Sequence, residues 1–582
     1  MKFQKLAFCT ASVLMLSVFS AVAGAASKDV DGNGAVNGKD ASALLSALVQ
    51  KSELTAACDV NADSAVNAFD LASLKQTLLQ DAMNSGESVT ADYAATAQYT
   101  KLIGRTWRDA DITWLVQSGS AAEFVVTGTS ATLTIAGDGC VYSDEKYRPR
   151  YAVLVDGEVL IDEVMSVEEK EIELFSGTTA RSATVRVIHL SEANNGAVGV
   201  KNLSVTSVAK NPVVPTEKKD LQIEFIGDSI TCAYGVEGES QYEAFSTATE
   251  NFMKSYAYLT AEKLGADYSA VAYSGHGVVS GYTTGDINTD SLVPDVYEYV
   301  GKIGNYQQPW DFEANPNDVV VINLGTNDSS YLTNDFENRS PEFVAAYTDF
   351  LQLVREKNPD AYIICTVGTM GCEDVYPLIE QAIVDYQAIN PDTRITSYLS
   401  ATQSMNDGLG SDWHPSLKTQ QNSAYVLADK ICEVLGLESD KVGLDAVADA
   451  TYDVDINTEN GANAAFFVGY DKSFWINLSM GGTSASDVEA YLCNFALYAG
   501  EYQLEFDYTS TVDVTVPFAV QHKDTPDTSY FSDTISATSE SQHYTGTFTI
   551  AAADENSELL FSLGGMDYFN ITLSNIKLIK LS

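Results

Sequence analysis

The stretch "LQIEFIGDSIT" (residues 221–231) decides the fold of the middle of this 582-residue chain. It begins with a nearly continuous apolar run, which is typical of a strand buried on both faces of a parallel sheet. Two runs of the same kind follow at 318–325 ("DVVVINLG") and 361–368 ("AYIICTVG"). The segment between these two has apolar residues at helical spacing, with Pro341 expected at the helix start. Strands alternating with helices predict an α/β domain over residues 218–438.

Polar residues follow the expected strands, at the sheet edge where α/β proteins bind ligands. Ser229 comes directly after the first strand and is expected to open a helix, whose free N–H groups favour an anion. Gly275 in "AVAYSGHG" can bring its N–H close to a ligand, and Asn327 in "VVINLGTND" can donate its side-chain amide. A late loop, "GSDWHPS", adds His414. Taken alone, "GDS" also fits a simple Asp/Ser helix cap.

In this order, Ser229, Gly275, Asn327 and His414 resemble the four blocks of the SGNH (GDSL-like) hydrolase superfamily. The resemblance implies a flavodoxin-like sheet and an acyl-enzyme mechanism, with Ser229 as nucleophile and His414 as its base. The Ser229 and Gly275 N–H groups and the Asn327 amide would hold the oxyanion. No catalytic metal or organic cofactor is implied.

The chain has five histidines, so rivals of His414 can be compared. Three are expected in β strands outside the α/β domain: His189, His522 and His543. His276 is the nearest rival, but a base beside Gly275 would displace the oxyanion contact. We therefore interpret His276 as a pocket-rim or substrate-contacting residue, and Asp228 as structural at the turn.

The position three residues before His414, where a triad acid is expected, holds Ser411. A β-rich opening, "GRTWRDADITWLVQSG" (104–119), followed by the four blocks, resembles carbohydrate esterase family 2 over residues 97–438. That family joins a β jelly roll to an SGNH domain and removes acetyl groups from plant polysaccharides, notably at 6-hydroxyls. Some members use a Ser–His dyad whose histidine is held by a backbone carbonyl. The resemblance implies such a dyad here, with the Asp412 side chain directed elsewhere. It also implies a sugar-binding wall, with these candidates: Trp413, Tyr282 and Trp310.

Short alternating strands with Gly or polar turns predict a β-sandwich at 97–210 and a second one at 445–582. Residues 211–220 ("NPVVPTEKKD") are expected to be a linker. The second sandwich contains an aromatic cluster that fits either a carbohydrate-binding module or core packing: Phe466, Phe467, Tyr470, Phe474 and Trp475.

A duplicated loop precedes these domains: "DVDGNGAVNGKD" (29–40) and "DVNADSAVNAFD" (59–70), each followed by a leucine-bearing helix. Oxygen ligands recur at the spacing of a calcium loop. The candidate ligands, with Ala35 and Ala65 using backbone carbonyls, are Asp29, Asp31, Asn33, Ala35, Asn37, Asp40, Asp59, Asn61, Asp63, Ala65, Asn67 and Asp70. Asp at the last position and one helix per loop resemble a type I dockerin over 27–82, which implies two structural Ca²⁺ ions and a scaffoldin cohesin as partner. Gly34 supplies the sharp turn of the first loop, whereas Ser64 in the second is expected to weaken that site. A polar linker is expected at 83–96.

The N-terminal segment 1–26 has Lys2 and Lys5, then an apolar run and small residues, which predicts a secretory signal peptide. A membrane anchor is the weaker alternative, and no other run reaches the ~20 apolar residues of a spanning helix. Without Cys9, seven scattered cysteines remain, which we interpret as mostly buried thiols. The composition of 33 Lys+Arg and 80 Asp+Glu gives a net charge of −47, which argues against nucleic-acid binding and suits neutral polysaccharides.

Together these features predict a secreted, cellulosome-associated esterase that removes acetyl groups from xylan, mannan or glucomannan, with a monomeric catalytic part. Two alternatives remain open from the sequence. One is an esterase or lipase for other acyl groups, and the other is a non-catalytic polysaccharide-binding component.

Overall fold

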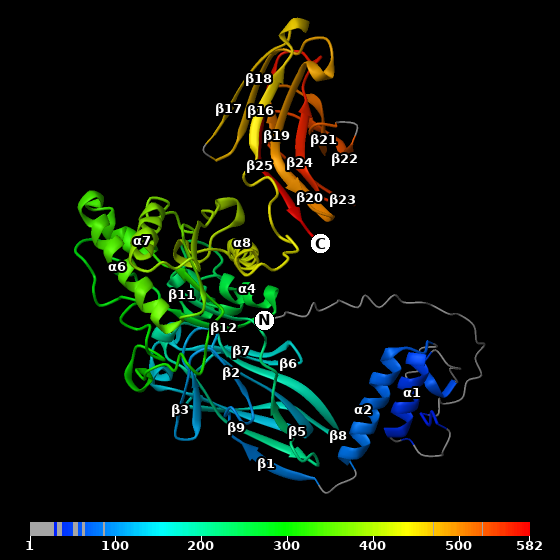
Figure 1. Ribbon diagram of the computed structural model, residues 1–582, viewed down its shortest axis with the longest axis vertical. Coiled ribbons are helices and arrows are strands. Elements are labelled where there is room, and N and C mark those ends of the chain that lie inside the picture. The colour runs from blue at the N-terminus through cyan, green and yellow to red at the C-terminus, as the bar shows by residue number, and fades with distance from the viewer. Residues whose placement is uncertain are drawn as a thin grey trace.

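The computed structural model describes residues 28–31, 36, 38–50, 56–60, 65–84, 88–469, 471–525 and 528–582. Figure 1 shows a pair of helices from the N-terminal part of the chain (blue), a curved β domain, a central α/β domain and a C-terminal β-sandwich. The expected signal peptide lies outside the described residues. Within the described part of the chain, no helix is both long and apolar enough to cross a membrane.

The central domain is built on a five-stranded sheet whose strand order is β12-β11-β13-β14-β15, all parallel. Its strands are β11 (Gln222–Gly227), β12 (Asp267–Ala272), β13 (Val319–Asn323), β14 (Tyr362–Val367) and β15 (Ile395–Leu399). In chain order this is 2-1-3-4-5, the flavodoxin-like arrangement. The three strands predicted from apolar runs are therefore confirmed as parallel. Edge strand β15 was not predicted, because "ITSYL" is only partly buried and lacks a continuous apolar run.

Helices cover both faces of this sheet (Figure 1). They are α3 (Ser229–Cys232), α4 (Tyr256–Leu264), α5 (Thr326–Leu332), α6 (Phe336–Lys357), α7 (Tyr376–Ile389) and α8 (Leu417–Leu435). Helices α4 and α8 share one buried cluster with the sheet, and α6 and α7 share another. The prediction that Pro341 starts a helix was wrong, because α6 begins at Phe336 and contains Pro341. Proline lacks an N–H, so its position inside α6 leaves one carbonyl of the preceding turn without its helical donor.

The first β domain is one hydrogen-bonded sheet of ten strands rather than two separate sheets. Its strands are β1 (Val89–Tyr93), β2 (Lys101–Ile103), β3 (Thr106–Asp109), β4 (Ile112–Leu115), β5 (Ala121–Gly137), β6 (Arg150–Val155), β7 (Glu158–Val164), β8 (Glu169–His189), β9 (Val198–Ser207) and β10 (Val213–Pro215). The long strands β5 and β8 pair along most of their length, with register shifts at which such strands can bend. The sheet therefore curls around a shared core that contains Phe124, Leu133 and Val185.

Both expected linkers beside this domain contain a strand. Strand β1 lies within 83–96 and pairs with β9, and β10 lies within 211–220 and pairs with β5. The prediction failed because short, polar or proline-bearing edge strands are held by backbone hydrogen bonds and leave little apolar pattern.

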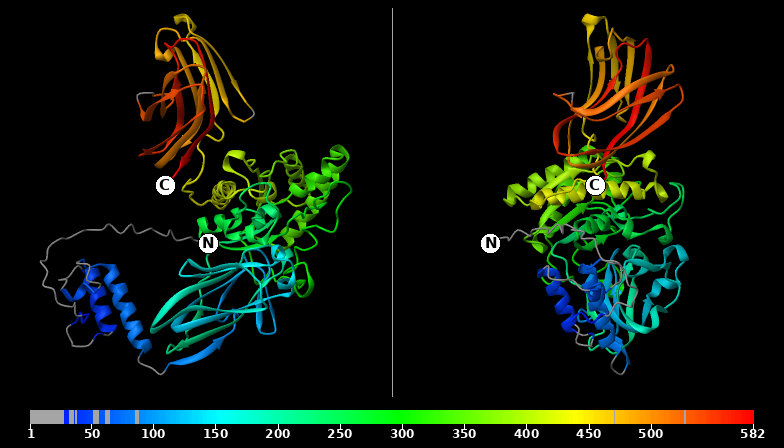
Figure 2. Two further views of the ribbon diagram at one scale, coloured as in Figure 1. Left: turned by 180° about the vertical axis from the view of Figure 1, so that it is seen from behind. Right: turned by 90° about the vertical axis from the view of Figure 1, so that its right-hand side faces the viewer.

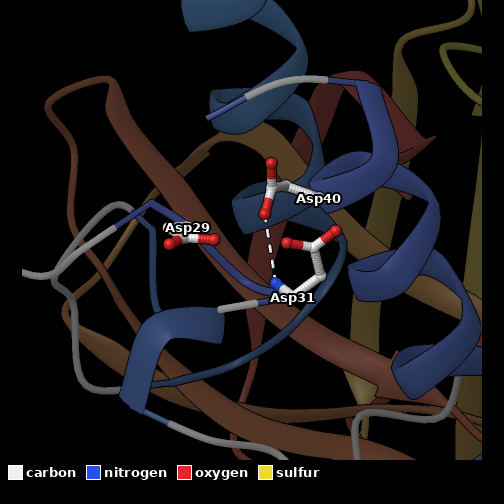
Figure 3. A group of neighbouring side chains, drawn as sticks. All are labelled: Asp29, Asp31 and Asp40. Atoms are coloured by element: carbon white, nitrogen blue, oxygen red, sulfur yellow. Dashed lines mark hydrogen bonds between the residues drawn. The ribbon is translucent and has the colours of Figure 1, made fainter. Parts of the chain in front are cut away.

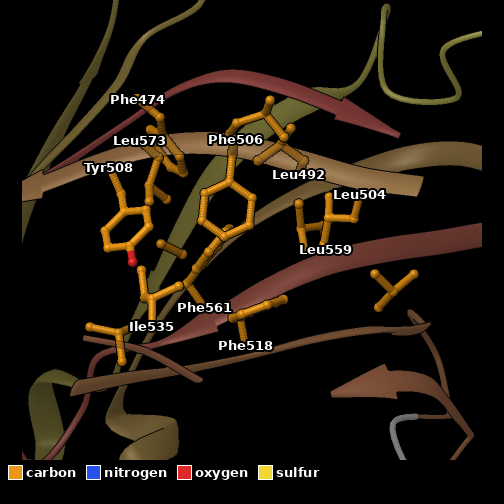
Figure 4. Packing of buried hydrophobic residues seen from close by; sticks show 14 of the residues in the cluster. Phe474, Leu492, Leu504, Phe506, Tyr508, Phe518, Ile535, Leu559, Phe561 and Leu573 are labelled. Atoms are coloured by element: carbon orange, nitrogen blue, oxygen red, sulfur yellow. The ribbon is translucent and has the colours of Figure 1, made fainter. Parts of the chain in front are cut away.

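The C-terminal domain is a sandwich of two five-stranded antiparallel sheets, ordered β16-β19-β24-β21-β22 and β17-β18-β25-β20-β23. Its strands are β16 (Thr451–Ile456), β17 (Asn463–Val468), β18 (Phe474–Met480), β19 (Val488–Leu497), β20 (Gly500–Ser510), β21 (Val514–His522), β22 (Ser529–Ala537), β23 (Gln542–Ile550), β24 (Asp554–Ser562) and β25 (Phe569–Lys580). Phe506, Phe518 and Phe561 pack together between the sheets (Figure 4). The predicted second sandwich is confirmed.

The aromatic cluster of this sandwich divides between its core and its surface. Phe474 is fully buried and belongs to the core, whereas Phe466 packs edge-on against its ring and is still 43% exposed. Phe467 and Trp475 are exposed and directly opposite each other on β17 and β18. Tyr470 lies outside the described residues.

At the N-terminal end, helices α1 (Gly38–Gln50) and α2 (Ala68–Asn84) pack through buried Leu44 and Leu74. The leucine-bearing helices predicted after each loop are confirmed. The seven cysteines of the described residues are all free thiols, and five of them are buried. This agrees with the interpretation of the cysteines as mostly buried thiols. Figure 2 shows the helical pair and the C-terminal sandwich on opposite sides of the central domain.

Candidate active site

Ser229 stands at the carboxyl end of β11, where the chain turns into α3. The Asp228 carboxylate caps this helix by accepting the Ile230 N–H at 3.0 Å. Ser229 is largely buried, and its Oγ lies 2.9 Å from Nε2 of His414. The predicted nucleophile and base are therefore brought within hydrogen-bond distance, although 185 residues separate them along the chain.

The loop before His414 supplies a backbone carbonyl where a triad has its acid. Asp412 and Trp413 both adopt left-handed conformations, with φ of 49° and 65°. In this loop the Asp412 carbonyl oxygen lies 3.0 Å from His414 Nδ1. When Nδ1–H donates to that carbonyl, Nε2 is unprotonated and can accept the Ser229 hydroxyl proton. The bend in the backbone thus fixes the tautomer that a base requires.

Ser411 has no room to be replaced by an acid. It is fully buried, and its N–H donates to the Gly235 carbonyl at 2.9 Å. A Cβ added at Gly235 would lie 2.7 Å from the Ser411 Cβ, and one at Gly238 would lie 2.2 Å from its Oγ. The Asp412 carboxylate turns away from the imidazole and accepts the Tyr234 hydroxyl at 2.8 Å.

Tyr234 was not predicted, yet it is in direct contact with the base. Its ring centroid lies 4.1 Å from that of His414, and its ring also stacks on Phe245 at 4.6 Å. Burial, with the hydrogen bond to Asp412, raises the pKa of Tyr234 and keeps its phenol neutral. Burial also lowers the pKa of His414, so the imidazole is neutral around pH 7. The sequence offered one signal, the position of Tyr234 just after the "GDSITC" turn.

Gly275 faces open space with a positive φ of 75°, and a Cβ there would meet nothing within 4 Å. In the described structure, neither the Gly275 N–H nor the Ser229 N–H has a hydrogen-bond acceptor. Both groups can therefore serve an incoming anion.

Hydrogen bonds hold the two residues that flank Gly275, Ser274 and His276. The Ser274 N–H donates to Glu192 Oε2 at 2.8 Å, and this glutamate comes from the first β domain. The imidazole of His276 lies 3.0 Å from the Ser274 carbonyl through Nδ1 and 2.9 Å from Lys302 Nζ through Nε2. Burial lowers the pKa of His276 to about 4, so its imidazole is neutral. Because both ring nitrogens already have these partners, His276 links parts of the protein and has no nitrogen free for the Ser229 hydroxyl.

The side chain of Asn327 lies at the site, but its amide already donates hydrogen bonds to two protein acceptors. Its amide nitrogen donates to Asp228 Oδ2 at 3.1 Å and to the His276 carbonyl at 2.9 Å. Burial raises the pKa of Asp228 to about 7. In this arrangement Asn327 fastens the Ser229 turn to the Gly275 loop.

Asp328 is another residue that the sequence interpretation passed over, although it completes the "GTND" motif. Its buried carboxylate accepts the N–H groups of Val278, Val279 and Ser280 at 2.8–3.0 Å. No sequence motif pointed to Glu192, because this residue lies in a different domain and in an ordinary polar turn. These two carboxylates shape the loop that carries Gly275.

The three candidate wall residues do not lie together. Trp413 is 48% exposed, with its ring edge-on to Tyr242 at 5.6 Å. Tyr282 is 62% exposed and donates its N–H to the Gly275 carbonyl at 2.8 Å. Trp310 instead packs at the domain junction, with the Arg105 guanidinium carbon 5.5 Å from its ring. The structure therefore places Trp413 and Tyr282 next to the proposed catalytic residues. Trp310 lies apart from them, at the domain junction.

The first duplicated loop brings three carboxylates together (Figure 3). Asp29, Asp31 and Asp40 each offer an oxygen, and these atoms lie within 4.8 Å of one another. In the second loop, buried Asp70 accepts the N–H groups of Val60 and Asn67, both at 2.8 Å. Five candidate ligands lie outside the described residues: Asn33, Ala35, Asn37, Asn61 and Asp63. The convergent oxygens of the first loop fit a hard divalent cation such as Ca²⁺.

Family models match three consecutive parts of the chain. Residues 225–419 match the GDSL-like lipase/acylhydrolase family, residues 102–215 the carbohydrate esterase 2 N-terminal family, and residues 27–79 the dockerin type I domain.

Three relatives share the central region. The cellulase/esterase CelE of Acetivibrio thermocellus is 34% identical over 325 residues, which cover 55% of this chain but only 37% of CelE. An acetylxylan esterase/glucomannan deacetylase of Cellvibrio japonicus is 26% identical over 60% of this chain and 92% of its own length. A solved family two carbohydrate esterase from Clostridium thermocellum, in complex with cellohexaose, is 31% identical with a TM-score of 0.51, over 58% of this chain and 99% of that one. With nearly all of that esterase matched at this identity, the chain belongs to carbohydrate esterase family 2 and carries a type I dockerin domain at its N-terminal end.

Proposed function

We propose that this protein is a secreted esterase that removes O-acetyl groups from plant polysaccharides by means of a Ser–His dyad. The observation that carries the proposal is the 2.9 Å contact of Ser229 Oγ with His414 Nε2, next to the open N–H of Gly275. Relatives described as acetylxylan esterase/glucomannan deacetylase and as cellulase/esterase support this chemistry.

The reaction runs through an acetyl-enzyme. Ser229 Oγ attacks the ester carbonyl while His414 Nε2 takes its proton. The tetrahedral intermediate collapses, its bond to the sugar oxygen breaks, and the imidazolium gives the proton to that oxygen, so the sugar leaves with a free hydroxyl. Water then attacks the acetyl group on Ser229 with His414 again as base, which releases acetate and restores the serine.

The oxyanion is stabilised by the N–H groups of Ser229 and Gly275, which have no acceptor in the described structure. Asn327 is the proposed third donor, and it takes this role when one amide hydrogen turns from Asp228 or the His276 carbonyl toward the oxyanion. Loss of one such donor typically lowers the rate on the order of 10²–10³-fold.

The substrate class follows from the surface around the dyad. Trp413, Tyr242 and Tyr282 expose aromatic rings there, which suit the apolar faces of sugar rings. The chain's net charge of −47 disfavours polyanionic substrates. Acetylated xylan, mannan or glucomannan fits both features, and the family resemblance favours the 6-hydroxyl.

The test is acetate release from acetylated xylan and glucomannan, together with hydrolysis of an aryl acetate. Ser229→Ala should lower both rates by at least ~10⁴-fold, because it removes the nucleophile. Ser536→Ala, an exposed serine on β22, is the matched control and should leave both rates unchanged. If Ser229→Ala keeps its activity, the proposed mechanism is wrong. Faster release of butyryl or feruloyl groups than of acetyl would instead favour the alternative of an esterase for other acyl groups.

We further propose that the dockerin loops bind Ca²⁺ and dock the enzyme to a cohesin on a scaffoldin. The proposal is supported by the convergent oxygens of Asp29, Asp31 and Asp40 and by the dockerin match. Removal of Ca²⁺ with a chelator should abolish cohesin binding and leave aryl acetate hydrolysis unchanged. Cohesin binding that survives chelation would contradict a structural role of the metal.

The C-terminal sandwich is proposed to bind polysaccharide through Phe467 and Trp475, which form an exposed cross-strand pair. Trp475→Ala should weaken retention on insoluble polysaccharide without changing aryl acetate hydrolysis. Unchanged retention on every polysaccharide tested would remove this role.

A further inference from the structure

A cleft of about 550 Å³ lies where the first β domain meets the α/β domain. Trp114 of β4 and Tyr142 line it from the β domain, and Ile303 and Tyr306 line it from the α/β domain. Neither Ser229 nor His414 is among its lining residues. Its volume falls within the range of about 300–1,000 Å³ that is usual for small-molecule sites.

The cleft combines apolar surface with hydrogen-bond acceptors, and its lining residues carry no positive charge. Tyr142 is 73% exposed and Ile303 is 57% exposed, although soluble proteins usually bury such side chains. Asp109, Glu168 and Asn305 add polar oxygens to its lining, where one Glu168 oxygen accepts the Tyr142 hydroxyl. Of its lining residues, all of which the structure describes, none is lysine or arginine. Lys201 lies beside the cleft but is paired with Glu169, so a phosphate or uronate would meet mainly like charge there, whereas a neutral ligand rich in hydroxyl donors fits.

The two walls are fixed to each other. Asp138 of the β domain accepts the Cys140 N–H and the Ala197 N–H, both at 2.9 Å, and the Tyr306 hydroxyl at 3.2 Å. The ring of Tyr306 also packs edge-on to Trp114, with centroids 6.0 Å apart. The rings of Trp114 and Tyr306 are thus held in place before a ligand arrives, which lowers the entropic cost of binding.

Both walls are also connected to the loop that carries Gly275. Asn194 lines the cleft and donates at 3.1 Å to Glu192, whose same oxygen accepts the Ser274 N–H. On the other wall, Lys302 directly precedes Ile303 and contacts His276. The cleft is therefore linked to the loop that carries Gly275 through short chains of contacts from both walls.

We infer that this cleft is a second binding site for a neutral polysaccharide chain, separate from the acetyl-binding site at Ser229. Tyr142 and Ile303 give the sugar rings an apolar surface, and the acidic rim accepts their hydroxyl groups. The inference rests on the proposed function for its substrate class, and it adds a site at which the polymer is held beside the active site.

The experiment uses the full chain with Ser229→Ala and three unacetylated probes: cellohexaose, xylohexaose and mannohexaose. Hydrogen exchange should show protection of 139–142 and 303–306 with at least one probe. The added pair Tyr142→Ala and Ile303→Ala should abolish that protection and weaken cleft binding roughly tenfold, as truncation of central contact residues usually does. Leu160→Ala, an exposed apolar residue on β7 outside the cleft, is the control and should change neither readout.

Three outcomes would overturn the inference. The first is no protection of either segment by any probe, and the second is equal protection in the Tyr142→Ala/Ile303→Ala protein. The third is protection by trigalacturonate instead of the neutral probes. Hydrolysis of an aryl acetate by Tyr142→Ala in the otherwise unaltered chain should stay within twofold of the parent. The exchange readout needs no catalysis, so failure of the esterase proposal would be seen separately, as absent acetate release by the parent chain.

Discussion

The two β domains of this protein are joined to the catalytic domain in different ways. The first shares a buried cluster with it, in which Ile103 and Ile188 pack with Phe225 of the central sheet. Their junction also contains a fully buried ion pair, Arg105 with Glu224 at 2.9 Å. The C-terminal sandwich has its own core, with no residue of the catalytic domain in that cluster.

Contacts to the C-terminal sandwich are instead polar and partly exposed. Lys577 bonds Asp407 at 2.9 Å, and on the segment leading to the sandwich Asp440 bonds Lys263 at 2.8 Å. Such contacts resemble ordinary interdomain interfaces, across which relative motion is common. The comparison indicates that the first β domain is part of the catalytic unit, whereas the sandwich is an attached module.

The largest expected effect comes from breaking the buried ion pair. Arg105→Met leaves the Glu224 carboxylate buried without its guanidinium, which should lower the free energy of unfolding of the catalytic unit by about 3–5 kcal/mol. Denaturant unfolding, followed by tryptophan fluorescence and aryl acetate hydrolysis, measures this loss.

The double variant Arg105→Met/Glu224→Leu is the control, because it removes both charges and should recover most of the loss. A loss below about 1 kcal/mol in the single variant would mean that the two domains are less tightly joined than the buried pair indicates.

Glu192 tests whether the β domain contributes to catalysis as well as to stability. Glu192→Ala removes the acceptor of the Ser274 N–H, so Gly275 is held less firmly. We expect kcat on an aryl acetate to fall roughly tenfold with little change in KM, less than the ~10²–10³ of losing a donor outright. Glu192→Gln keeps an acceptor oxygen and should stay near the parent value. Equal losses in both variants, with a lowered unfolding midpoint, would mean a purely structural role.

The sequence predicted the parts of this site that local patterns carry. Continuous apolar runs marked the central strands, and short motifs after them marked Ser229, Gly275 and Asn327. Tyr234 and Glu192 could not be found in this way, because their contacts with His414 and Ser274 arise only when distant segments pack. Edge strand β1 was missed because its pairing with β9 depends on backbone groups that every residue has.

A smaller effect is expected at Asp412, whose backbone holds the base while its side chain bonds Tyr234. Asp412→Asn should lower kcat/KM no more than about fivefold, against the ~10⁴-fold typical of a triad acid. A loss near 10⁴ would show that the carboxylate itself orients the imidazole.

The pH dependence of kcat/KM provides a second test of the role of Asp412. Burial lowers the pKa of His414, so the neutral base persists below pH 6.5 and kcat/KM falls only when the pH drops through that lowered pKa. The charge of Asp412 partly opposes this shift by raising the pKa. Asp412→Asn should therefore move the acidic limb to lower pH, and a move to higher pH would contradict the assignment.

The smallest effect is expected at the junction with the C-terminal sandwich. Lys577→Ala removes a partly exposed ion pair with Asp407, which should change the free energy of unfolding by less than about 1 kcal/mol. Aryl acetate hydrolysis should stay within twofold of the parent, because the sandwich shares no core residue with the catalytic domain. A loss as large as that of Arg105→Met, measured in the same unfolding experiment, would make the sandwich an integral part of the catalytic unit, because a partly exposed ion pair that acts alone contributes far less.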